Sequence, residues 1–168
     1  MHRALKIAHL IGLALFLGSV FGHVVAAILG GPPGSPGFLP ACTEIVAATR
    51  ALTLPGLGLA VLSGLGMAIV SPGLRRQRWL WLHAGLALLV VVSSLALLAP
   101  AGRRALVAAQ ALAADGAGAP DLAAALLVER VAGAVNIVLA IALLAVGVIK
   151  PALRARIGAG NGEQRIRS

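Results

Sequence analysis

The segment HLIGLALFLGSVFGH, residues 9–23, determines what kind of fold this chain can adopt. A histidine stands at each end, and only apolar or small side chains lie between them. The segment is part of an apolar run over residues 5–29, which exceeds the roughly 20 residues that a helix needs to cross a bilayer. The sequence therefore predicts a transmembrane helix that carries two imidazoles.

Three further apolar runs of similar character follow, at residues 52–70, 79–98 and 131–149. Charged residues make up only 11% of the chain, against about 25% in soluble domains. Tyrosine is absent, and short alternating segments with aromatic girdles, as in a membrane β-barrel, are not seen. We expect an all-α fold, a four-transmembrane-helix bundle. Residues 1–156 should form this single domain, and residues 157–168 a disordered tail.

The positive charges follow the ends of the predicted spans. The formal net charge is +9, but the cations gather at the span ends without interleaved aromatic residues, which argues against nucleic acid as a partner. One side of the bundle collects ten cations: Arg3, Lys6, Arg75, Arg76, Arg78, Lys150, Arg154, Arg156, Arg165 and Arg167. The other side collects four: Arg50, Arg103, Arg104 and Arg130. The asymmetry predicts that both termini are cytoplasmic, and the membrane that we expect is a bacterial inner membrane.

The connections between the spans differ in kind. GGPPGSPGFLP, residues 30–40, predicts an irregular outer loop. SPGLRRQR, residues 71–78, predicts a tight inner turn. Residues 101–129 predict an outer loop that is itself helical: a short helix, a turn, and an extension of the fourth span with Asp121 as its N-cap.

Small residues recur at a spacing of four in two of the spans. Gly18 and Gly22 make one such pair, and the second span carries a longer stripe of Gly56, Ala60, Gly64 and Ala68. Such stripes allow close helix packing in lipid. They predict a tight bundle and nothing about its function.

The most informative polar residues are His9 and His83. Both lie near the cytoplasmic ends of their spans, so they share a depth on two helices, and Met67 falls in the same layer. Two imidazoles at matched depth are the ligand set of a bis-histidine b-type haem, while imidazole with thioether also suits copper. The alternative interpretation is that both histidines are interfacial and hydrogen-bonded to water or lipid headgroups.

A second polar group gathers near the outer face. It consists of His23, Glu44, Glu129, Arg130 and Asn136, with Arg50 close by. Polar groups within a membrane frequently mark a functional site, so this outer polar cluster could relay protons or meet a quinone headgroup. Interfacial ion pairs are the simpler interpretation.

The same residues carry a family resemblance. LKIAHLIGLALFLGS resembles the first span of small four-helix proteins of the HemJ and CopD neighbourhood, and RWLWLHAG is similar to the start of the third span of HemJ-type protoporphyrinogen oxidases. LTLPGLGLAVLSGLGMA and VGVIKP resemble still more closely a related family of uncharacterised predicted integral membrane proteins. The resemblance implies that His9 ligates haem b and that His83 is the histidine of the third-span motif. Gly85 stands where the HemJ pattern has a functional lysine, which argues against porphyrinogen oxidation.

These observations favour an integral membrane protein that binds haem b and has an electron-transfer role, with quinone, another membrane protein or a second copy as possible partners. Two alternatives remain open from the sequence. One is a cofactor-free membrane subunit or scaffold, and the other is a copper-handling protein.

Overall fold

The computed structural model describes residues 2–71, 73, 76–116 and 121–150. The predicted tail at residues 157–168 and the domain boundary at 156 lie outside this part. The elements are α1 (His2–Gly30), α2 (Phe38–Ala48), the π-helix η1 (Thr49–Thr53), α3 (Leu54–Val70), α5 (Arg78–Val92), the π-helix η2 (Ser93–Leu98), α6 (Ala99–Asp115) and α7 (Leu122–Ile149). Consecutive elements merge, so the described residues contain four long helices that are apolar enough to cross a membrane. The predicted all-α, four-span architecture is confirmed.

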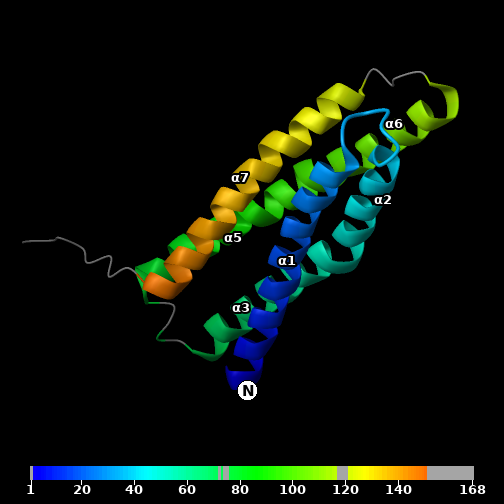
Figure 1. The fold of residues 1–168 in the computed structure, drawn as a ribbon. Helices are drawn as coiled ribbons and strands as arrows, with labels where there is room; N and C mark the ends of the chain where they lie inside the picture. Colours follow the sequence, from blue (N-terminus) through cyan, green and yellow to red (C-terminus); the bar gives the residue numbers. More distant parts are fainter. Residues whose placement is uncertain (1, 72, 74–75, 117–120, 151–168) are drawn as a thin grey trace, which may run out of the picture.

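The four helices associate as two antiparallel pairs. α1 packs along α3, and α5 packs along α7, while α2 contacts both α1 and α6 and so joins the pairs at one end. Figure 1 shows the start of α1 and the end of α7 at the same end of the bundle. We call this the N-terminal end and the opposite one the loop end. The side of the membrane that each end faces stays a prediction.

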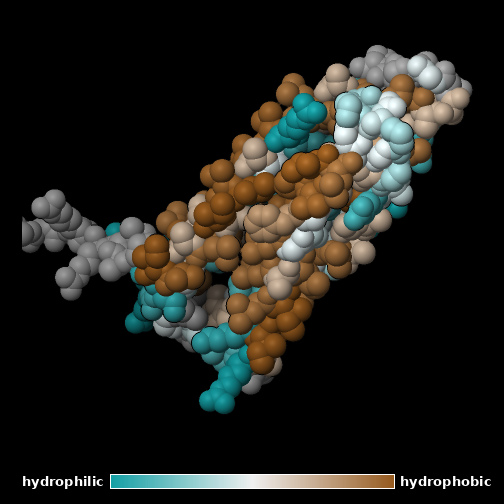
Figure 2. Space-filling model, viewed as in Figure 1, coloured by the Kyte–Doolittle hydropathy of each residue, from teal (hydrophilic) through white to brown (hydrophobic). Residues whose placement is uncertain are grey.

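The outer surface of the bundle is built for lipid. Figure 2 shows apolar side chains over the middle of the visible face and hydrophilic ones gathered mainly towards its two ends. Large aliphatic side chains are widely exposed: Ile28 is 72% exposed, Leu29 78% and Val148 80%. A soluble monomer rarely shows apolar patches on this scale, so lipid contact is the physical explanation.

Close packing of α1 on α3 depends on two glycines. A Cβ on Gly12 would lie 2.6 Å from the Ala60 amide nitrogen, and one on Gly56 would lie 2.8 Å from the Phe16 amide nitrogen. The stripe predicted in the second span therefore does pack against a neighbour. The prediction for Gly18 and Gly22 was wrong: both are exposed, and an added Cβ would meet no atom within 4 Å.

The helices extend further than the apolar runs. α2 begins at Phe38, so residues 38–40 of the predicted outer loop are helical. Pro40 is tolerated because the first turn of a helix leaves its N–H groups without intrahelical partners. The hydropathy pattern missed residues 41–51 because Glu44 and Arg50 interrupt it, although the helix continues through both.

The connection between the third and fourth spans is helical, as predicted. α6 ends at a left-handed Gly116 with φ of 67°, and α7 follows from Leu122. Asp121 occupies the N-cap position, but its side chain makes no capping hydrogen bond. The N-cap position of Asp121 was therefore predicted correctly, but the capping hydrogen bond that an N-cap aspartate usually makes is not formed.

Each of the two longest helices contains one π-helical turn, and each turn ends two residues before a proline. η1 precedes Pro55, and η2 precedes Pro100. Proline has no N–H to offer the carbonyl one turn earlier, and π-turns are a common way to accommodate such a break, frequently at functional sites. Both turns lie towards the loop end of the bundle.

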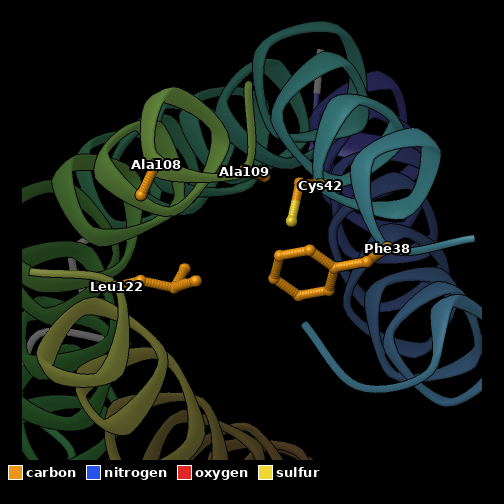
Figure 3. Close-up of a cluster of buried hydrophobic side chains, with 5 residues drawn as sticks. All are labelled: Phe38, Cys42, Ala108, Ala109 and Leu122. Atoms are coloured by element: carbon orange, nitrogen blue, oxygen red, sulfur yellow. The ribbon is translucent and has the colours of Figure 1, made fainter. Parts of the chain in front are cut away.

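Two apolar clusters hold the pairs together. In the middle, Phe16, Leu57, Val90 and Ala140 bring one side chain from each long helix into contact. Nearer the loop end, Phe38 and Cys42 of α2 face Leu122 of α7, beside Ala108 and Ala109 of α6 (Figure 3).

Candidate functional site

His9 projects from α1 into the bundle, towards α3. Its Nδ1 lies 2.8 Å from the Ala60 carbonyl oxygen and 3.3 Å from Ser63 Oγ. A carbonyl can only accept, so Nδ1 carries the proton and donates it. In the neutral imidazole this tautomer leaves the lone pair of Nε2 available to a ligand.

His83 occupies the corresponding position in the other helix pair. It lies on α5 and interacts with the main-chain carbonyl of Leu143 on α7, while its Nδ1 is buried without a hydrogen-bond partner among the described residues. The two imidazoles lie close enough to interact electrostatically. The two histidines are thus near one another, both rings are half-buried, and their role as a ligand pair stays a prediction.

The two histidines are seated in the same way. The His9 ring lies 3.4 Å from a Cβ position on Gly64, and the His83 ring lies 3.4 Å from one on Gly147. In each pair the glycine stands four residues after the residue whose carbonyl the imidazole contacts, Ala60 or Leu143. Because glycine has no side chain, the carbonyl one turn earlier stays uncovered and the imidazole ring has room beside it. The two glycines, Gly64 and Gly147, are visible in the sequence, but their position opposite the histidines becomes clear only when the pairing of the helices is known.

Met67 is half-buried on α3, one turn beyond Ser63. Ser63 contacts His9, so Met67 lies about one helical turn from that contact, and its role as a ligand stays a prediction. Among the described residues, no three His, Cys, Asp or Glu side chains converge as metal ligands.

A large cavity lies in the other half of the bundle. It has a volume of about 750 Å³ and is lined by all four long helices, including residues of η1 and η2. Most of its wall is aliphatic, and Phe38 and Cys42 border it near the loop end. Ligand pockets of proteins commonly have volumes of about 300–1,000 Å³.

The outer polar cluster is assembled around this cavity. His23, Glu129, Arg130 and Asn136 line it. Glu44 lines an adjoining recess next to Gly22 and Pro40, and it interacts electrostatically with His23. The residues grouped from sequence depth alone are therefore close in space.

Asn136 is the most deeply buried residue of this cluster, and only part of its amide group is hydrogen-bonded. It is 2% exposed, and its Nδ2 donates to Ser94 Oγ of η2 over 3.1 Å. Within the part of the chain that the structure describes, its Oδ1 has no hydrogen-bond partner, and neither has His23 Nε2, although both atoms are buried. Buried polar atoms in proteins are nearly always hydrogen-bonded, so these two atoms require an explanation.

Charged residues surround the wider part of the cavity. Arg50, Arg103 and Arg130 line it and are exposed. The half-buried Glu129 packs over the backbone of Gly102, with its Oε1 3.0 Å from the position of a Cβ there. The interpretation of the cluster as interfacial ion pairs stays open beside the functional one.

Sequence reasoning missed three features of the cavity. Arg103 was counted only as a topological charge, and neither π-turn was predicted. The available signal was a hydroxyl residue shortly before each proline: Thr53 before Pro55, and Ser94 before Pro100. Thr53 bonds to Ser19 of α1 over 2.9 Å, and Ser94 bonds to Asn136 of α7, so each π-turn is tied to a neighbouring helix.

A comparison with family models gives one match. The model described as "Predicted integral membrane protein (DUF2269)" covers residues 3–151. The chain belongs to the DUF2269 family. No curated protein and no solved structure matches this DUF2269 chain. The expected membership of an uncharacterised family of integral membrane proteins is thus confirmed, while the relationship to HemJ and CopD stays a prediction.

Proposed function

We propose that this DUF2269 protein binds one b-type haem between His9 and His83 and serves in electron transfer in a bacterial inner membrane. The tautomer of His9 carries the proposal. Because Nδ1 donates to the Ala60 carbonyl, Nε2 is the nitrogen left for iron. Haem-ligating and metal-ligating histidines commonly have their other ring nitrogen fixed in this way.

The second ligand in the proposal is His83. Its ring lies against Gly147 of α7, beside the Leu143 carbonyl, so α7 positions this imidazole as α3 positions that of His9. His83 belongs to the other helix pair, so iron bound to both imidazoles would connect α1 to α5. When bound, haem supplies a one-electron couple whose potential depends on its axial ligands and on the surrounding hydrogen bonds.

The chain's own residues would orient and protect the group. Gly64 and Gly147 fix the two ring positions, while Ser63 adds a second polar contact to His9. Gly85 has open space around it and no side chain to act as a base, so the proposal includes no porphyrinogen oxidation. Met67 is not required as a ligand in this arrangement.

An absorption spectrum of the purified full-length protein tests the proposal. We expect a Soret band and a sharp α-band after reduction, lost in His9→Ala and in His83→Ala. His23→Ala is the matched control, because its imidazole lies in the other half of the bundle and should leave the spectrum unchanged. Colourless wild-type protein that co-purifies with another membrane component would favour a scaffold, and stoichiometric copper in elemental analysis would favour copper handling.

A further inference from the structure

We infer that the large cavity near the loop end binds the headgroup of a lipid-soluble quinol, held between His23 of α1 and Asn136 of α7. The inference deepens the proposed function by naming its redox partner, and it rests on that function for the reason a quinol would bind there. The binding itself is independent of haem, which allows the two to be tested separately.

The cavity has the size and lining that this ligand requires. About 750 Å³ is enough for a substituted ring and the first part of an isoprenoid tail. Most of the wall is apolar, with aliphatic side chains such as Val20, Ile45 and Ile137, and the polar side chains of His23 and Asn136 belong to the same lining. An apolar pocket with a small number of convergent polar atoms is the usual form of a small-molecule site.

The two unpartnered atoms define the chemistry of the ligand. Asn136 is 2% exposed, and its Nδ2 is directed at Ser94, so Oδ1 is an acceptor without a donor. A hydroxyl group meets that need. His23 Nε2 can donate or accept, depending on its tautomer. A quinol has two hydroxyl groups on opposite sides of its ring, and each can donate or accept.

The Asn136–Ser94 pair also suits the oxidised form. Rotation of the amide by 180° would let the Ser94 hydroxyl donate to Oδ1 and would present the NH₂ group to a quinone carbonyl. Ser94 lies in the π-turn η2, where it is held at the cavity wall. The pair can therefore follow the change in the ligand from donor to acceptor without a change in the backbone.

A bound phospholipid fits the same cavity less well. Its phosphate would pair with the exposed Arg50, Arg103 and Arg130, and its acyl chain would then reach the deep end. An acyl chain offers no hydrogen bond to Asn136 Oδ1 or His23 Nε2. A buried polar atom without a partner is costly, so the two buried atoms favour the quinol over the lipid.

The test uses the full-length His9→Ala chain, which cannot oxidise the ligand through a haem bound at that histidine. Native mass spectrometry would measure the binding of decylubiquinol, kept reduced, with decylubiquinone and phosphatidylglycerol as comparison ligands. We expect one decylubiquinol per chain. Asn136→Leu and His23→Leu, made in the same background, should each weaken binding about tenfold, the effect of one lost buried hydrogen bond. Val138→Ala, a change at a 65% exposed position on the same helix, should leave binding unchanged.

Three results would overturn the inference: no binding of either quinone form, equal binding by His23→Leu and Val138→Ala, or tighter binding of phosphatidylglycerol than of decylubiquinol. His23→Leu lies on a different helix from Asn136, so a folding defect in Asn136→Leu does not remove the test. A wild-type protein that binds decylubiquinol but is colourless would refute the haem proposal alone. A haem protein that binds no quinol would refute this inference alone.

Discussion

Gly12 of α1 lies so close to Ala60 of α3 that a Cβ at Gly12 would stand 2.6 Å from the Ala60 amide nitrogen. The neighbouring atom belongs to a helix backbone, so it cannot move aside as a flexible side chain would. The contact sets the distance between α1 and α3 about one helical turn from His9.

Gly12→Ala should therefore destabilise the protein. The added methyl group forces the helices apart, and overpacking of this kind costs about 1–3 kcal/mol. Cys42 is buried and is the only cysteine, so a thiol-reactive fluorophore can report thermal unfolding in detergent. We expect a lower Tm for Gly12→Ala than for wild type. Gly18→Ala, on the same helix with open space around it, should not lower the Tm. Equal melting of the two variants would contradict the packing argument.

The packing of the two imidazoles against Gly64 and Gly147 can be tested with side chains of increasing size at these positions. An alanine at position 64 or 147 places its Cβ 3.4 Å from the histidine ring, which is an acceptable contact. The additional methyl groups of Gly64→Val or Gly147→Val would push the ring away from its carbonyl partner. We expect the alanine variants to keep the haem spectrum and the valine variants to lose or shift it. Gly85→Val, next to no other side chain, is the control, and a spectral loss there would point to a general folding defect.

The role of Met67 can be decided by Met67→Leu, which keeps the volume of the side chain and removes its sulfur. If His9 and His83 are the two axial ligands, the reduced spectrum should stay the same. A change to the spectrum of a five-coordinate or high-spin haem would instead identify the thioether as a ligand.

The orientation of the chain is open to a labelling experiment. In a Cys42→Ala background, Pro36→Cys places a thiol in the exposed loop at the end of α1, and Gly73→Cys places one between α3 and α5. With both termini cytoplasmic, a membrane-impermeant maleimide should label Pro36→Cys in intact cells and Gly73→Cys only after lysis. The reverse pattern would invert the predicted topology.

Hydropathy predicted the number and type of the spans because lipid imposes a length and a composition that the sequence displays directly. The ends of the helices followed a different rule. Once α2 packs against α1 and α6, Glu44 and Arg50 can remain in a helix although they interrupt the apolar run. Tertiary contact decided these boundaries, and the residue pattern alone does not contain it.

The candidate site was predictable to a similar degree. Depth along the spans brought His9 and His83 to one level, and it grouped His23 with Glu129 and Asn136. It did not show which side each residue faces, so the hydrogen bond from His9 to Ala60 and the unpartnered Asn136 Oδ1 came from the structure. Helix pairing supplies that information, and it also explains why Gly12 packs closely while Gly18 does not.

The π-turns change the direction in which the side chains of the second and third long helices point around the helix axis. An α-helix advances about 100° per residue, so the extra residue that a π-turn accommodates rotates everything beyond it by roughly that amount. α3 can then face α1 while α2, on the same continuous rod, also faces α6. Deletion of a single residue from η1 or η2 would rotate the outer segment of the helix about its axis, so that a different face would meet the neighbouring helices. The residues that line the cavity would no longer face one another, although every apolar residue of the span remained. Single-residue deletions in η1 or η2 should therefore be far more harmful than most substitutions.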